Sequence, residues 1–252
     1  MLIVEKLIGG KVLARLQESD PMETAKVTPV SRMWLTQNMF EPLLHSRGKE
    51  FGAIQKFSTA VVHYEEEDDG VLVVVQDVET LQYSKYKAQY VVACDGNRSP
   101  VRRAENIPWN GPGIQGNNIS VNLKADLAPY LGVRAVHGVT YINNNKINAG
   151  FRLEGGGKKG FLIVTKTNDR QDFAPDSVTA EDAKRYFFDA SGIENDLPVE
   201  VESIGYWTSA AFNCDTYMSR RGRIFLAGDA SHVVPPTGGM GGNTGIQVCE
   251  GK

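Results

Sequence analysis

Cysteine is scarce in this sequence, and long apolar runs are absent. Only three cysteines, Cys94, Cys214 and Cys249, occur among the 252 residues, and no two of them form a CxxC pair. This usage fits a reducing compartment, gives no disulfide framework and predicts no metal site. No apolar stretch approaches the roughly 18 residues that a membrane helix needs, so no membrane partner is expected.

An excess of charge of one sign is also missing. Lys and Arg number 27 against 30 Asp and Glu, which gives a net charge of −3. Without a basic field, no nucleic acid partner is expected. The first residues carry neither a basic leader nor a small-residue cleavage site, which predicts a cytoplasmic location. Hydrophobic residues make up 41% of the chain, enough for the core of one large domain or two modest ones.

The first half of the chain predicts one helix and several strands. The helix covers residues 38–49, with Asn38 and Glu41 as a capping pair. Its apolar side chains share one face: Met39, Leu43 and Leu44. Strands rich in β-branched residues are expected at 57–64, 71–75 and 90–93. The acidic run 65–70 ends in Asp-Gly and is interpreted as a hairpin tip rather than a cation site.

The second half predicts an antiparallel sheet and one further helix. Residues 111–116 are punctuated by Gly and Pro and indicate a domain boundary. Strands are expected at 118–123, 135–142, 146–153 and 160–165. The three glycines at 155–157 lack a following Lys-Ser/Thr and a helix, so they predict a hairpin loop rather than a phosphate cradle. A helix over 179–190 begins with Thr179 as its cap and Asp182 at its third position.

A strand that ends in Asp95 and Gly96 is the first stretch with chemical meaning. Ser99 and Pro100 follow and open a helix, where proline is tolerated because no donor is needed. Strand ends that face a helix N-terminus are where doubly wound sheets bind nucleotides. The sequence leaves two readings of Asp95 open, a helix-capping residue or a ligand-binding residue.

The second stretch follows a short strand at 223–227 and begins with Gly228 and Asp229. Asp229 could accept hydrogen bonds from a sugar hydroxyl, or it could pair with a nearby arginine such as Arg223. Two prolines and five glycines follow between 235 and 245, and they let backbone approach a flat ligand closely. Backbone N–H groups that lead into a helix start would form an electropositive rim for an anion. A binding site is the favoured interpretation.

Together the two stretches resemble FAD-dependent aromatic monooxygenases with the para-hydroxybenzoate hydroxylase fold. Residues 94–103 (CDGNRSPVRR) match the Asp-Gly motif of that family. Residues 222–247 (GRIFLAGDASHVVPPTGGMGGNTGIQ) match its Gly-Asp motif almost throughout. The Pro-Pro-Thr-Gly-Gly segment at 235–239 resembles the phenol and polyketide hydroxylase branch most.

The resemblance implies an FAD site and assigns residues to it. Gln37 matches a glutamine near the flavin, Asp95 and Gly96 match the motif linked to the FAD pyrophosphate and NAD(P)H, and Asp229 after Gly228 matches the ribitol-binding carboxylate. Pro235 matches the residue beside the isoalloxazine ring. The loop at the N1/O2 edge of the ring is matched by Gly238, Gly239, Gly241, Gly242 and Asn243.

No catalytic side chain is named, because in this family the oxygen chemistry belongs to the flavin. His232 is interpreted as structural or hydrogen-bonded to backbone, Tyr141 as a packing residue, and Trp207 and Phe212 as core or interdomain aromatics.

Two features depart from the family. Members of the family begin with a βαβ unit that carries a Gly-x-Gly-x-x-Gly turn for the ADP pyrophosphate; no such unit is recognised here, and residues 8–11 (IGGK) imitate its turn poorly. The sequence also stops at Lys252, where the family continues with a long helix. We therefore expect a fragment, with an α/β (mixed α+β) fold that consists of an incomplete Rossmann-like FAD-binding domain and an inserted antiparallel substrate sheet.

The expected organisation divides the chain into three segments. Residues 1–116 and 204–252 would form the FAD-binding domain, and residues 117–203 the substrate-binding sheet. The expected function is the hydroxylation of a small phenolic or polycyclic aromatic substrate with NAD(P)H and O₂. The alternative is a non-catalytic remnant, or an aromatic-ligand binding module, that does not retain FAD. The sequence does not define the oligomeric state.

Overall fold

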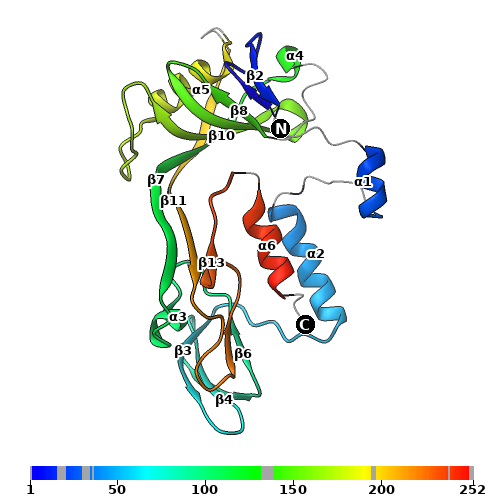
Figure 1. The fold of residues 1–252 in the computed structure, drawn as a ribbon, viewed down its shortest axis with the longest axis vertical. Coiled ribbons are helices and arrows are strands. Elements are labelled where there is room, and N and C mark those ends of the chain that lie inside the picture. Colours follow the sequence, from blue (N-terminus) through cyan, green and yellow to red (C-terminus); the bar gives the residue numbers. More distant parts are fainter. Residues whose placement is uncertain are drawn as a thin grey trace. The chain divides into compact units, whose positions relative to one another are not determined.

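The computed structural model describes residues 2–15, 21–29, 35, 37–131, 139–193, 197–237 and 239–249 (Figure 1). The chain divides into two compact units. The first unit combines Met1–Trp34 with Gly116–Ser209, and the second combines Leu35–Gln115 with Ala210–Lys252. The fold class is the expected mixture of α and β structure.

A mixed sheet forms the body of the first unit. Its strands are β1 (Leu2–Val4), β2 (Val12–Arg15), β7 (Trp109–Lys124), β8 (Thr140–Asn143), β9 (Ile147–Glu154), β10 (Lys159–Thr167) and β11 (Glu200–Cys214). Their order is β11-β7-β10-β9-β8-β1-β2, and β13 (His232–Val233) of the second unit adds an eighth strand beside β11. The pairs β1–β2, β8–β9, β9–β10 and β10–β7 are antiparallel, whereas β1 and β8 are parallel. β7 and β11 both continue past the boundary of the unit.

One face of this sheet is covered by α5 (Ala180–Ser191) and forms the core of the unit (Figure 1). Alternate residues of the central strands are fully buried on this face, among them Ile119, Val121 and Leu162. Phe187 of α5 is buried as well and lies 6.3 Å from the ring of Phe151. The expected capping box is confirmed: the Thr179 hydroxyl accepts from the N–H of Asp182, and the Asp182 carboxylate accepts from the N–H of Thr179.

Short elements complete the first unit. They are α1 (Pro21–Val27), α4 (Ala128–Leu131) and the single-turn 3-10 helix η2 (Gly155–Gly157). Because β9 and β10 pair antiparallel on either side of η2, the three glycines form a hairpin loop, as predicted.

The second unit contains two small sheets and several helices. Its elements are α2 (Gln37–Glu50), β3 (Thr59–Glu66), β4 (Val71–Asp77), β5 (Tyr83–Ala88), β6 (Val91–Ala93), α3 (Pro100–Ala104), β12 (Ile224–Leu226), the 3-10 turn η3 (Gly228–Ala230), β13 (His232–Val233) and α6 (Met240–Cys249). β3, β4 and β5 form an antiparallel sheet, and β12 pairs with β6 in parallel. The acidic run is the β3–β4 hairpin tip, where Glu67 N–H donates to the Gly70 carbonyl at 2.8 Å.

Three expectations differ from the structure. Residues 1–34 group with the large sheet, not with the following segment, because β1 pairs with β8. The stretch 111–116 contains the expected domain boundary, since the two units divide between Gln115 and Gly116, but it lies within β7, so the strand expected at 118–123 begins earlier, at Trp109. Of the strand expected at 135–142, residues 135–138 lie outside the described residues, and β8 begins at Thr140.

The helix expected at 38–49 is confirmed as α2, but none of its residues is buried. The apolar side chains of Met39, Leu43 and Leu44 are 57%, 64% and 57% exposed. The helix begins at Gln37, so Pro42 is its sixth residue and leaves the Asn38 carbonyl without its usual helical donor.

Among the described residues, none of the helices combines the length and the apolar character that crossing a membrane requires.

Candidate functional site

The parallel pair β6 and β12 brings the two predicted motifs to one edge. Val91 is paired with Ile224 and Ala93 with Leu226, and the Ala227 N–H donates to the Ala93 carbonyl at 3.0 Å. Both strands therefore end at the same side. The carboxyl ends of parallel strands are where open α/β sheets bind ligands. The two motifs, which are far apart in the sequence, are therefore neighbours in the fold.

The turn after β6 places Asp95 at the start of α3. Its Oδ2 accepts from the Val101 N–H at 3.1 Å, and the Ser99 hydroxyl caps the same helix by accepting from the Arg102 N–H at 2.9 Å. Gly96 has a φ of +81°, and a Cβ there would meet open space. Asp95 thus has the capping contact that the sequence left open, and the residue is exposed.

The buried side chain of Arg102 is hydrogen-bonded to the backbone of this turn. Arg102 is 6% exposed, donates to the Asn97 carbonyl at 3.1 Å and stacks its guanidinium 4.0 Å from the centre of the Trp109 ring. Trp109 in turn stacks on Phe212 at 5.5 Å. The sequence analysis missed this stack, because nothing in the local pattern pairs Arg102 with a tryptophan seven residues later.

Asp229 has no ionic or hydrogen-bonding partner within the described part of the chain, and it is exposed. The Arg223 guanidinium donates instead to the carbonyl oxygens of Gln89 at 3.3 Å and Asp68 at 2.7 Å. The interpretation in which Arg223 neutralises Asp229 is therefore wrong. The carboxylate at the end of β12 is available to a ligand.

Several glycines on either side of Asp229 in the sequence have free space where a Cβ would stand. Gly228 has a φ of +58° and Gly239 a φ of +68°, and a Cβ at either position, or at Gly242, would meet no atom within 4 Å. α6 lies against the turn, since a Cβ on Gly245 would be 3.6 Å from the Gly228 Cα. The backbone here is accessible on a side where side chains would obstruct a flat ligand.

The start of α6 supplies donors. The backbone N–H groups of Met240, Gly241 and Gly242, in its first turn, have no acceptor within the helix, and Asn243 follows them. The Asn243 amide donates back to the Gly239 carbonyl at 2.9 Å and fixes the entry of the helix. Gly238, also predicted for this loop, lies outside the described residues.

Pro235 and Gln37, which were also predicted for the site, do not lie at the ends of β6 and β12. Pro235 is half-buried in the segment between β13 and α6. Gln37 is the exposed first residue of α2, and its amide donates to Glu41 of the same helix. The geometry thus brings together Asp95, Gly96, Gly228 and Asp229, but it gives Gln37 no contact with them among the described residues.

Burial raises two pKa values beside this region. The Tyr64 hydroxyl donates to Glu105 at 2.9 Å, and its partial burial together with this hydrogen bond raises its pKa well above the usual range. Burial also raises the pKa of the Cys214 thiol. Neither group is thereby suited to give up a proton near neutral pH.

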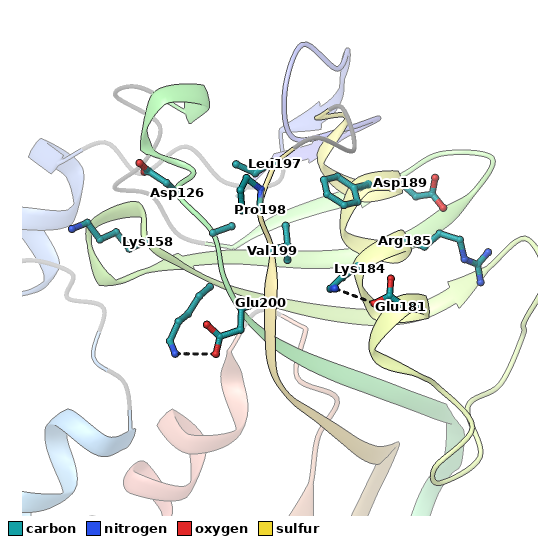
Figure 2. A pocket seen from close by; sticks show the side chains of 13 residues that line it. Asp126, Lys158, Glu181, Lys184, Arg185, Asp189, Leu197, Pro198, Val199 and Glu200 are labelled. Atoms are coloured by element: carbon teal, nitrogen blue, oxygen red, sulfur yellow. Dashed lines mark hydrogen bonds and ion pairs between the residues drawn. The ribbon is translucent and has the colours of Figure 1, made fainter.

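A separate groove belongs to the first unit (Figure 2). It has a volume of about 1070 Å³, an apolar floor that includes Phe188 and Val199, and a charged rim. Much of that charge is paired: Lys184 lies 3.0 Å from Glu181, and Lys124 lies 3.3 Å from Glu200. The lining has equally many basic and acidic residues, so its charge favours neither a cationic nor an anionic ligand. No group of residues that could hold a metal ion occurs in the described chain.

The family of the chain follows from a comparison with known proteins. The family model described as "FAD binding domain" matches residues 6–248. The chain therefore belongs to the FAD binding domain family, and the resemblance to FAD-dependent monooxygenases is confirmed.

Two relatives of this chain are named as monooxygenases. It is 34% identical to 4-methyl-5-nitrocatechol 5-monooxygenase of Burkholderia sp over 97% of this chain and 44% of that protein. It is 33% identical to tetracenomycin B2 monooxygenase-dioxygenase of Streptomyces olivaceus over 93% of this chain and 42% of that protein. The chain thus spans less than half the length of these curated relatives.

A solved structure has the same fold. The ternary complex of aklavinone-11 hydroxylase with FAD and aklavinone superposes with a TM-score of 0.84 and 27% identity. The match covers 98% of this chain and 46% of that one.

The residues at the strand ends fit an FAD. Asp229 is unpaired, the backbone at Gly228, Gly239 and Gly242 is open on the side where a Cβ would stand, and α6 presents free N–H groups. The fit is incomplete for the adenine half, since neither stretch with the Gly-x-Gly-x-x-Gly spacing, 111–116 or 155–160, lies between a strand and a helix.

Proposed function

We propose that this chain is the flavin-binding part of a monooxygenase that hydroxylates phenolic or polycyclic aromatic substrates with NAD(P)H and O₂. The observation that carries the proposal is Asp229, an exposed carboxylate without a partner in the described chain, at the shared end of β6 and β12. Bound FAD supplies the redox chemistry, in which electrons from NAD(P)H activate O₂. The printed names of the relatives support this class of reaction.

The chain's own residues bind and orient the cofactor in this proposal. Asp229 accepts hydrogen bonds from ribityl hydroxyls, and Asp95 with Gly96 lines the pyrophosphate region. Pro235 lies beside the isoalloxazine ring. Free N–H groups at the start of α6, around Gly241, stabilise negative charge at the N1/O2 edge of the ring, because a helix N-terminus favours an anion.

The open face of the large sheet supports an aromatic substrate. Tyr141 is paired with Gly150, Gly150 with Ile163, and Ile163 with Ser120 across successive strands. Trp207 donates from its indole nitrogen to the Ser120 hydroxyl at 2.8 Å. This row combines aromatic and aliphatic side chains with two small positions, a surface on which a planar ring can stack. We propose that residues 117–203, with the adjoining part of β11, form the substrate-binding part.

A flavin titration tests the proposal. Purified chain is titrated with FAD, and quenching of flavin fluorescence gives the dissociation constant. We expect saturable binding that FMN and riboflavin reproduce in part, because the predicted contacts are with the ribityl and ring portions. Absence of binding, or equal binding of adenosine diphosphate without flavin, would contradict it. Binding of an aromatic ligand by a chain that does not bind flavin would favour a binding module instead.

A further inference from the structure

His232 is a buried histidine with one satisfied and one unsatisfied nitrogen. It lies in β13, directly after the Gly-Asp turn, and is 6% exposed. Its Nδ1 lies 3.1 Å from the Ser231 hydroxyl, and its Nε2 is buried without a hydrogen-bond partner in the described structure. An unpartnered buried acceptor costs free energy, so packing alone would favour an apolar side chain at this position.

The hydrogen bonds of Ser231 determine which nitrogen of His232 carries the proton. The Ser231 hydroxyl donates to the Gly228 carbonyl at 2.9 Å. A hydroxyl has a single proton, so toward the imidazole the same oxygen can only accept. Nδ1 of the neutral ring is therefore the protonated nitrogen, and Nε2 carries the lone pair.

The chain of hydrogen bonds from His232 through Ser231, called the relay below, ends at the Gly228 carbonyl. Gly228 has a positive φ and no Cβ, and glycine loses more conformational freedom on folding than any other residue. Its carbonyl accepts both from the Ser231 N–H and from the Ser231 hydroxyl, each at 2.9 Å. The far side of the turn is anchored by the Cys214 N–H, which donates to the Ser231 carbonyl at 2.9 Å.

We propose that His232 is a positioning residue: through Ser231 it fixes the Gly228 carbonyl, and thereby the direction in which Asp229 meets a ligand. The proposal rests on the proposed function, because the ligand in question is the ribityl portion of FAD. A packing role would require only a side chain of the right volume at position 232. The proposed role also requires the Nδ1–H tautomer, which donates to the Ser231 hydroxyl.

The tautomer is measured by nitrogen-15 NMR of the imidazole ring at pH 8. The chain has four histidines, and the signal that disappears in His232→Asn belongs to His232. We expect the Nδ1–H pattern in the unchanged protein and a loss of this preference in Ser231→Ala. An Nε2–H pattern, or a pattern that Ser231→Ala leaves unchanged, would overturn the proposal.

Flavin affinity is the second readout. The loss of one hydrogen bond should weaken FAD binding about three- to tenfold in Ser231→Ala and in His232→Gln. His232→Asn should retain most of the affinity, because its amide N–H takes the place of Nδ1–H. His63→Asn, at an exposed position of β3, is the control and should leave the affinity unchanged. Equal losses in His232→Asn and His232→Gln, with both variants folded by circular dichroism, would leave only packing and would contradict the relay.

The two proposals fail in different ways. If the unchanged chain binds no FAD, the proposed function fails, and the tautomer measurement alone decides whether the relay exists. If FAD binds but the tautomer is the other one, the proposed function stands and the role of His232 does not.

Discussion

Asp229 is a charged group that the chain itself leaves without a partner. Replacing it with Asn keeps the size and polarity but removes the charge from its hydrogen bonds. A hydrogen bond to a charged group is worth about 1.5–3 kcal/mol, so we expect Asp229→Asn to weaken FAD binding by about ten- to hundredfold. Flavin fluorescence titration measures this change.

The matched control for that variant is Asp126→Asn, since Asp126 is another exposed aspartate and belongs to the first unit. It should leave flavin affinity unchanged. Unaltered affinity in a folded Asp229→Asn chain would assign Asp229 to structure.

The cysteines give a second prediction at the scale of single residues. Cys94 is exposed and precedes Asp95, whereas Cys214 is buried and its thiol pKa is raised. Alkylation depends on the thiolate and on access, so a reagent such as iodoacetamide should modify Cys94 at least tenfold faster than Cys214. Peptide mass spectrometry measures both rates in one sample. FAD should slow the labelling of Cys94 alone, and equal protection of both thiols would point to a general tightening instead.

Two glycines in neighbouring strands make a matched pair at the scale of elements. A Cβ on Gly160 of β10 would lie 2.9 Å from both Leu123 and Phe151, whereas a Cβ on Gly150 of β9 would have only ordinary contacts of 3.7 Å or more. We expect Gly160→Ala to lower the free energy of unfolding by about 1–3 kcal/mol through overpacking. Gly150→Ala should cost less than half of that. Urea unfolding measures both, and equal effects would contradict the packing argument.

Elements with strong local signals were predictable from the sequence. The start of α5 is predicted by Thr179 and Asp182, and the start of α3 by Ser99 and Pro100. The strand before Gly228 is predicted because it is continuous and apolar. The strands β1 and β2 were not predicted, because both are short and because β1 joins the sheet by pairing with β8, which is far away in sequence. β7 was underestimated, since its glycines resemble turn residues although they lie within a long strand.

The candidate site was predictable to the same degree. The carboxylates Asp95 and Asp229 follow strand ends, and strand ends can be found in a sequence. The cation stack of Arg102 on Trp109 and the relay from His232 to Gly228 could not be found that way. Both depend on which side of a turn a side chain faces, and no spacing rule encodes that.

At the scale of the whole molecule, the prediction concerns retention of the cofactor. The Gly-x-Gly-x-x-Gly spacing occurs at 111–116, inside β7, and at 155–160, in the β9–β10 hairpin. Neither stretch joins a strand to a helix N-terminus, so contacts to the ADP half of FAD are missing from the set that the chain offers. We expect purified chain to hold FAD weakly and to lose most of it on dialysis. The absorbance at 450 nm relative to protein measures the residual content. A stoichiometric yellow protein after dialysis would show that other residues bind the pyrophosphate.

The exposed apolar side chains of α2 also have a consequence for the half-life of this chain in a cell. Met39, Leu43 and Leu44 are the kind of exposed hydrophobic segment to which chaperones and proteases respond. The abundance of the chain would then be set by how quickly this helix finds a covering surface, and not by the stability of the sheets. Polar substitutions at these positions would be expected to lengthen its half-life while leaving the Gly-Asp turn untouched.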